Sequence, residues 1–181
     1  MALALDISSA NFNTIGVSAL VTLSGPNSSF SNLSGLSANQ GTFKLSSSAS
    51  FATAGNFTNS GSMTLSPGSV LTVNGAFTQT STGKLTEQIG GTASSPTFGS
   101  VVSTGTVSLA GTLSVTSTVV AAVGSSFEIL NNESASAISG TFTNLPEGAT
   151  FTVKVGATTM TFQITYKGGA KANSVVITRI S

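Results

Sequence analysis

The chain has 181 residues, but charged residues make up only 6% of it, and six Lys or Arg against five Asp or Glu leave a net charge of +1. The six basic residues are scattered, whereas nucleic-acid binding needs clustered Lys and Arg to displace counterions from phosphates, so no nucleic-acid partner is expected. The absence of cysteine and histidine excludes disulfides, thiolate metal sites and a Ser-His-Asp triad, and no apolar run approaches the roughly 18 residues of a membrane-spanning helix.

The first predicted strand covers residues 3–7. Leu3, Leu5 and Ile7 alternate there with small or polar residues, which is typical of a half-buried strand. Asp6 is its only charge, and charges normally protect a strand edge from pairing with other chains. We therefore expect this strand to be an association edge that packs against a preceding coil of the chain or a neighbouring subunit.

The centre of the chain contains an internal repeat. Residues 42–59 match residues 62–79 at an offset of 20 without a gap, and Ser, Thr and Ala fill most positions between the apolar ones. A period near 20 with alternating apolar residues is typical of a β-solenoid, whose coils stack about 4.8 Å apart. The match predicts three stacked pairs of inward side chains: Leu45 on Leu65, Phe51 on Leu71, and Phe57 on Phe77.

The repeat extends in both directions. Residues 21–24 resemble residues 43–46 at an offset of 22, which adds Leu23 to the row of Leu45 and Leu65, and a further step of 20 adds Leu85. Glycines also recur every 20 residues, at Gly35, Gly55 and Gly75. We expect these glycines at corners of the coils, because glycine tolerates positive φ.

The pattern changes twice after residue 85. Residues 86–100 predict a strand and a looped excursion, and alternation returns over residues 101–115. From residue 125 the strands are mostly longer, and Val155-Gly156-Ala157-Thr158 predicts a tight hairpin. The predicted fold is therefore all-β: a parallel β-solenoid (β-helix) of coils with repeats of about 20 residues over residues 1–124, followed by a small antiparallel β cap over residues 125–181.

Several segments resemble a known class of surface protein. They are Gly140-Thr-Phe-Thr-Asn-Leu-Pro-Glu-Gly-Ala-Thr-Phe151, Thr161-Phe-Gln-Ile-Thr-Tyr-Lys-Gly-Gly169, Asn173-Ser-Val-Val-Ile-Thr178 and the repeat Gly55-Asn-Phe-Thr-Asn-Ser-Gly61. Over roughly residues 40–181 the chain is similar to bacterial autotransporter-like and haemagglutinin-like β-strand-repeat surface proteins. That resemblance implies a β-helix passenger with a C-terminal cap, located outside the cell or on the surface of a bacterium.

No catalytic or metal-binding group is expected. Enzymes built on β-helices use clustered or paired acids, whereas the five acids of this chain are spread from Asp6 to Glu147. Glu128 and Glu133 are the closest pair, and with two asparagines between them they are typical of a solvated turn rather than a Ca²⁺ loop. We therefore predict that the protein is not an enzyme and has no catalytic residues, no cofactor and no metal.

The sequence predicts a role by class only. We expect a non-catalytic structural segment of an extracellular surface, adhesin or fibre protein, which works through a Ser/Thr/Asn-rich surface and associates with itself or with neighbouring repeats. One alternative is a glycan- or ice-binding module that uses outward threonines such as Thr64, Thr72 and Thr78, in columns interrupted by Lys44, Ala52 and Asn59. Another is a subunit of a phage fibre or other filament.

Overall fold

The computed structural model describes residues 11–181, so the predicted association edge formed by Leu3, Leu5 and Ile7 lies outside the described residues. The described part is all-β, which confirms the predicted fold class at that level. Its helical content is one turn of 3-10 helix, η1 (Ser31–Leu33). The strands form three sheets, none of them closed.

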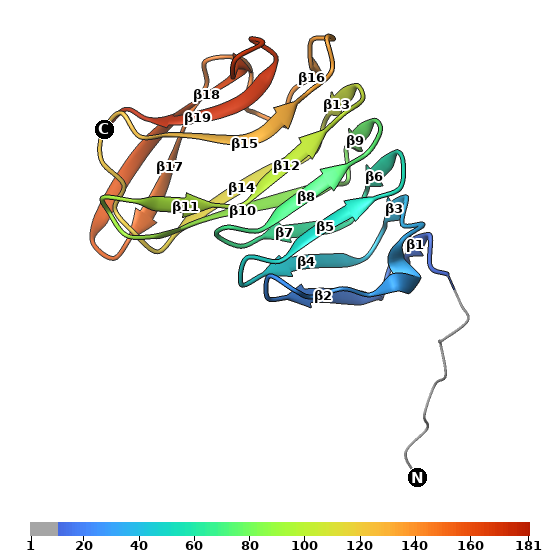
Figure 1. The fold of residues 1–181 in the computed structure, drawn as a ribbon. Coiled ribbons are helices and arrows are strands. Elements are labelled where there is room, and N and C mark those ends of the chain that lie inside the picture. The colour runs from blue at the N-terminus through green and yellow to red at the C-terminus, as the bar shows by residue number, and fades with distance from the viewer. Residues whose placement is uncertain (1–10) are drawn as a thin grey trace.

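We name the three sheets A, B and C (Figure 1). Sheet A is parallel and contains β1 (Thr14–Ile15), β3 (Ala38–Asn39), β6 (Phe57–Asn59), β9 (Phe77–Gln79), β13 (Val107–Leu109) and β16 (Ser139–Gly140). Sheet B contains the parallel strands β2 (Leu20–Ser24), β4 (Thr42–Ser46), β7 (Ser62–Leu65), β10 (Lys84–Gly91) and β14 (Thr112–Ser117), with β11 (Pro96–Phe98) antiparallel to β10.

Sheet C is mixed. Its parallel part contains β5 (Ser50–Thr53), β8 (Val70–Val73), β12 (Ser100–Ser103) and β15 (Ser126–Asn132). Its antiparallel part contains β19 (Ser174–Arg179), β18 (Thr158–Gly168) and β17 (Thr150–Val155). Strands β1 and β2 lie at one end of the stack of strands, and β17, β18 and β19 lie at the other end (Figure 1).

The chain visits the sheets in rotation. After β3 in sheet A it passes through β4 in sheet B and β5 in sheet C, and it then returns to sheet A as β6. Parallel neighbours need a long return connection, and here the other two sheets provide it. Strands that are one repeat apart in the sequence therefore lie side by side in space, and we call one passage of the chain through the three sheets a coil.

The stacked pairs expected from the repeat are adjacent in the structure. Leu45 pairs with Leu65, and both side chains are fully buried. Phe57 pairs with Phe77, and their buried rings stack with centroids 6.4 Å apart and planes 8° apart. Such a pair stabilises the fold by about 0.5–1.5 kcal/mol beyond the contribution of the buried apolar area. The remaining predicted partners are also paired, Leu23 with Leu45 and the half-buried Phe51 with Leu71.

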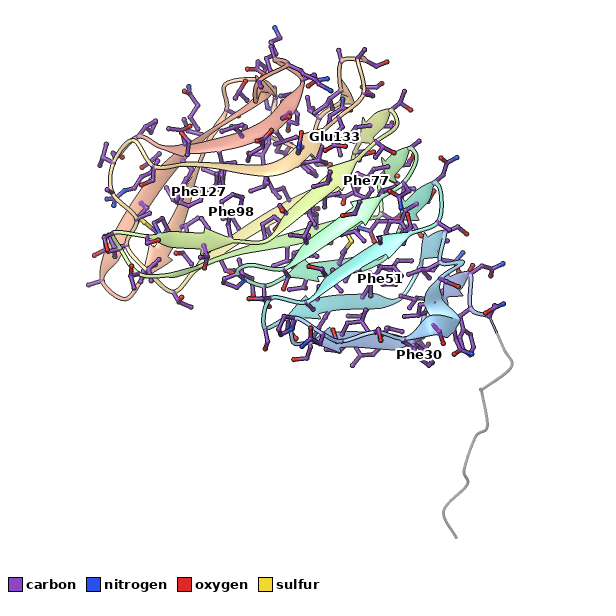
Figure 2. All side chains as sticks on the ribbon, viewed as in Figure 1. Phe30, Phe51, Phe77, Phe98, Phe127 and Glu133 are labelled. Atoms are coloured by element: carbon purple, nitrogen blue, oxygen red, sulfur yellow. The ribbon has the colours of Figure 1, made fainter. Side chains whose placement is uncertain are left out.

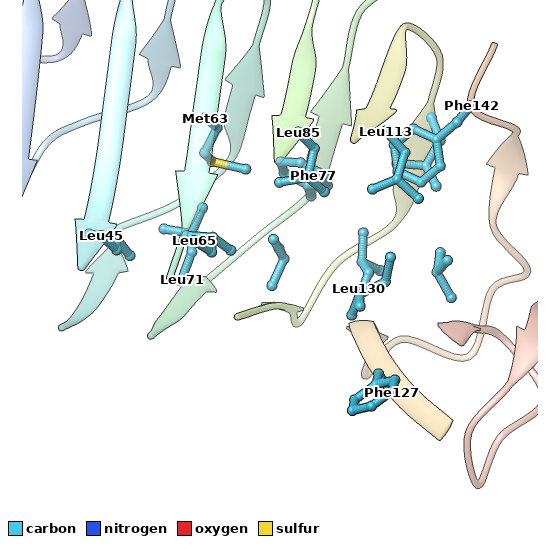
Figure 3. Close-up of a cluster of buried hydrophobic side chains, with 14 of the residues drawn as sticks. Leu45, Met63, Leu65, Leu71, Phe77, Leu85, Leu113, Phe127, Leu130 and Phe142 are labelled. Carbon is cyan, nitrogen blue, oxygen red and sulfur yellow. The ribbon is translucent and has the colours of Figure 1, made fainter. Parts of the chain in front are cut away.

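The expected position of Leu85 in the row of Leu65 is wrong. Leu85 pairs with Met63, and Glu87 is the partner of Leu65. The cause is the corner that precedes β10. Asn59 pairs with Gln79 at an offset of 20, but Ser62 pairs with Lys84 at an offset of 22, so this corner contains two extra residues. Figure 3 shows Met63, Leu85 and Leu113 following one another through the core.

Gly35, Gly55 and Gly75 lie in turns or bends between strands, as expected, but none of them has positive φ. Glycine is required sterically at the residues just before strands of sheet B, where the backbones of successive coils are in contact. A Cβ atom on Gly61 would lie 2.2 Å from the carbonyl oxygen of Gly41, and one on Gly41 would lie 2.2 Å from that of Gly16. Close approach of the backbones therefore selects glycine at this corner.

We expect Gly61→Ala to destabilise the fold by at least about 1 kcal/mol, because the new methyl group overlaps backbone atoms that cannot move independently. Gly55→Ala is the matched control, since a Cβ there meets nothing within 4 Å and φ is not positive. The free energy of unfolding from urea titration should fall for the first variant and stay equal or rise for the second. Equal values for the two variants would contradict the close stacking of this corner.

The end of the molecule is covered by the antiparallel strands of sheet C. Strand β15 pairs in parallel with β12 on one side and antiparallel with β19 on the other. Parallel pairing therefore continues beyond residue 124, through β16 to Gly140. The predicted hairpin is confirmed, with Val155 paired to Thr158 and a positive φ of 57° at Gly156.

One buried tyrosine joins the loop after β16 to the antiparallel strands. The hydroxyl group of Tyr166 donates to the carbonyl oxygen of Leu145 (2.7 Å) and accepts from the backbone N–H of Phe142 (3.0 Å). Burial raises the pKa of this phenol to about 12; the N–H of Phe142 lowers the pKa and the nearby Glu147 raises it. The phenol therefore stays neutral and keeps both hydrogen bonds over the physiological range.

Candidate functional site

A column of hydrogen-bonded amides lies in the core, at the last residues of β3, β6 and β9. Asn39 Nδ2 donates to Asn59 Oδ1 (2.8 Å) and to the carbonyl oxygen of Ser62 (3.0 Å). Asn59 Nδ2 donates in turn to Gln79 Oε1 and to the carbonyl oxygen of Lys84, both at 3.2 Å. All three amide side chains are buried. We call Asn39, Asn59 and Gln79 the amide ladder.

The sequence pattern does not predict the amide ladder. It predicts Asn59 on the outer surface, as an interruption of a threonine column. That expectation is wrong, because residues 57 and 59 of a strand share one face and Phe57 points inward. The available signal was the spacing of Asn39, Asn59 and Gln79, which are 20 residues apart. Hydrogen bonds between identical positions of adjacent coils favour one register over all others.

The outer face of sheet B carries hydroxyl groups. One row across its five parallel strands consists of Thr22, Lys44, Thr64, Thr86 and Ser114. A second row on the same face consists of Leu20, Thr42, Ser62, Lys84 and Thr112. These ten residues, which we call the hydroxyl face, are exposed or half-buried, and two lysines are their only charges. The face can hydrogen-bond to water or to hydroxyl-rich ligands, and it offers no carboxylate.

The three outward threonines expected to act together are on different sheets. Thr64 lies on sheet B, Thr72 on sheet C and Thr78 on sheet A. The predicted interruption at Lys44 does fall on the hydroxyl face, next to Thr64. A flat ligand could therefore meet Thr64 together with its neighbours on sheet B, but not all three predicted threonines.

Contrary to expectation, the acidic pair is not in a turn: Glu128 and the two asparagines belong to strand β15, and Glu133 directly follows that strand. Glu128 and Glu133 line a hollow together with Asn131, Lys171 and Asn173, among others. The ammonium group of Lys171 donates to the carbonyl oxygen of Glu133 and brings a positive charge to the same hollow. In residues 11–181 no three His, Cys, Asp or Glu side chains lie close enough together to hold a metal ion.

A third acid has an unusual position. Glu87 is fully buried in sheet B, and neither of its carboxyl oxygens has a hydrogen-bond partner among the described residues. Desolvation by burial raises the pKa of this carboxyl well above its usual range. The alternation of Leu85, Glu87 and Ile89 along β10 indicates this inward position, but the expected row of leucines has Leu85, not Glu87, beside Leu65.

An apolar surface is exposed beside strand β2. In the described part of the chain, β2 is an edge strand with no partner beyond it, and Val17 and Leu20 are 77% and 63% exposed. Beside them is a hollow lined mainly by apolar side chains, including Phe12, Phe30 and Leu33. Such a surface is typical of an interaction site rather than of a solvated end.

Comparison with known proteins identified no relative: no family model, no curated protein and no solved structure matches the chain. Within residues 11–181, none of the helical structure has the length and apolar character needed to cross a membrane.

Proposed function

We propose that the chain is a β-solenoid that serves as a non-catalytic structural segment of an extracellular surface, adhesin or fibre protein, with a bacterial source. The observation that carries the proposal is the pairing of repeat-related residues in all three sheets: Leu45 with Leu65 in sheet B, Phe51 with Leu71 in sheet C, and Thr58 with Thr78 in sheet A. A stack of this kind gains its core only by adding coils, so its natural use is to supply length and surface.

The composition of the surface supports the same role. The hydroxyl face presents Ser and Thr with few charges, and such a surface stays hydrated without attracting polyanions. The resemblance to haemagglutinin-like repeat proteins, carried by residues 140–151, 161–169 and 173–178, agrees with an extracellular location.

Antibodies against the purified protein provide the test on cells of the source organism. An extracellular structural segment should be labelled on intact cells or in the culture medium, and an external protease should remove the signal from the cell surface. Labelling that requires permeabilised cells, with a soluble intracellular protein as reference, would contradict the proposed location.

Association is the second part of the proposal. Among residues 11–181 the outer edge of β2 has no partner strand, β2 carries no charge, and its first residue, Leu20, is exposed, so we expect a second copy to pair at this end. Light scattering should show a concentration-dependent increase in mass that is lost in Leu20→Lys, because the new ammonium group protects the edge. A mass that is monomeric at every concentration, or one that Leu20→Lys leaves unchanged, would contradict the association.

A binding role is favoured by one observation, the hydroxyl face. Binding of glycan or ice by this face predicts retention on a glycan array or a thermal hysteresis that Thr64→Lys abolishes, whereas Thr72→Lys on sheet C leaves it intact. The structural role predicts that neither activity is present. It also predicts no turnover of polysaccharides, which incubation with a broad panel of glycans would check.

A further inference from the structure

Glu87 interrupts an aliphatic row in the core. On β10 the side chains of Leu85, Glu87 and Ile89 all point inward and are at most 1% exposed. The pairing partners of Glu87 are Leu65 on β7 and Val115 on β14. A carboxyl group therefore occupies the place that Leu23, Leu45 and Leu65 fill in the three coils before it.

The carboxyl group lies against the corner between β11 and β12. A Cβ atom on Gly99 would be 2.6 Å from Oε2 of Glu87 and 2.5 Å from the carbonyl oxygen of Leu65, so the missing side chain of Gly99 provides the room for the acid. The excursion that precedes this corner is exposed over residues 91–95. Phe98 holds the end of this excursion in place, because its ring packs edge to face against the ring of Phe127 with the ring centroids 5.4 Å apart. Figure 2 shows the two residues near each other.

Within residues 11–181, no charged side chain of the elements around Glu87 compensates its carboxyl group. Leu65 of β7, Val115 of β14 and Gly99 at the corner are not titratable. The other charged residue of β10, Lys84, is exposed on the hydroxyl face. An ionised carboxylate in this place would be a buried charge without a partner, which is among the most destabilising arrangements in a protein core.

We propose that Glu87 is held in the folded chain as the neutral carboxylic acid and that its ionisation is a pH-dependent switch, which opens the corner at Gly99 and loosens the excursion of residues 91–98. The inference is independent of the proposed surface role. Gly99 itself is buried, but the exposed excursion directly precedes it, so this corner is the place where a local opening would admit water to the carboxyl group.

The direction of the pH effect follows from the raised pKa of Glu87. The folded chain binds the proton more tightly than the unfolded chain, in which a Glu has a pKa of about 4.3. The stabilisation that comes from the neutral acid is complete below the unfolded pKa, and it is lost as the pH rises through the folded pKa. The contribution of Glu87 to stability is therefore largest in acidic solution and declines as the pH increases.

Thermal unfolding of the wild type, Glu87→Gln and Glu87→Leu between pH 5 and pH 9 tests the proposal. We expect the Tm of the wild type to fall with pH, and the Tm of both variants to exceed it at pH 9 by at least about 3 °C, with a smaller difference at pH 5. Glu133→Gln, which removes an exposed acid from the loop after β15, should follow the wild type. A difference between wild type and Glu87→Gln that does not change with pH would overturn the proposal.

Two further measurements locate the effect. Infrared spectra of the wild type at pH 6 should contain a protonated carboxyl band that Glu87→Gln lacks, and absence of this band would overturn the proposal even if the variants fail to fold. Limited proteolysis at pH 9 should cut residues 91–98 faster in the wild type than in Glu87→Gln, with equal rates at pH 5. Equal rates at both pH values would show that ionisation does not open this corner.

Discussion

Leu65→Ala is expected to lower the free energy of unfolding by about 2–5 kcal/mol. Leu65 is fully buried between Leu45 and Glu87 in sheet B. Truncation removes apolar contacts with both neighbouring coils, and stacked backbones on either side cannot close the gap. Urea denaturation monitored by circular dichroism would measure the change.

Ser62→Ala is the matched control, because Ser62 lies on the same strand with its side chain exposed on the hydroxyl face. Its effect should stay within about 0.5 kcal/mol. If Leu65→Ala shifts the unfolding midpoint no more than Ser62→Ala does, Leu65 is not in a stacked core and the inward row is wrong.

Asn59→Ala is expected to destabilise the protein by about 3 kcal/mol, because a buried acceptor that loses its donor costs about 1–3 kcal/mol. Asn59 occupies the centre of the amide ladder, between Asn39 and Gln79. Its removal takes away the donor to Gln79 Oε1 and the side-chain donor to the carbonyl oxygen of Lys84. It also leaves a void between two coils.

Asn27→Ala, in an exposed turn, should leave the stability close to that of the wild type. Because the ladder acts between coils, its loss should also broaden the unfolding transition as register becomes less well defined. An Asn59→Ala variant as stable as Asn27→Ala would show that the amide ladder contributes nothing to the fold.

The inward pairs were predictable because the repeat is gapless where they occur. Over residues 42–79 an offset of 20 is maintained in all three sheets, so Leu45 lies on Leu65 and Phe57 on Phe77. Alternation within each strand then determines which side chains point inward. Where both conditions hold, the sequence alone specifies the stacking.

Other positions were not predictable from the period. Two additional residues in the corner before Lys84 move Leu85 into the column of Met63 and Glu87 into the column of Leu65. The apolar pattern does not show in which corner an insertion lies. Alternation along β10 places Glu87 on the inward face with Leu85 and Ile89, but acids usually prefer solvent, so the burial of a carboxyl group in this row is not expected from composition.

The amide ladder could have been anticipated. Asn39, Asn59 and Gln79 obey the same period as the apolar pairs, but a polar residue in a Ser/Thr-rich chain is normally assigned to the surface. Burial of an amide becomes favourable only when the next coil supplies its hydrogen-bond partner. That condition depends on the assembled stack rather than on any one strand.

The central claim is that coils one repeat apart lie in register, and proximity of paired side chains tests it directly. The chain has no cysteine, so a variant with Thr58→Cys and Thr78→Cys carries one thiol pair, at positions that are partners in sheet A. Dibromobimane, a short cross-linker that fluoresces strongly after joining two thiols, should react within single molecules of this variant. A variant with Thr58→Cys and Ser108→Cys should react far less, because Ser108 is the partner of Thr78 and lies one strand further on, about 10 Å from Thr58. Equal fluorescence from the two variants, or none from the first, would contradict the stacked arrangement.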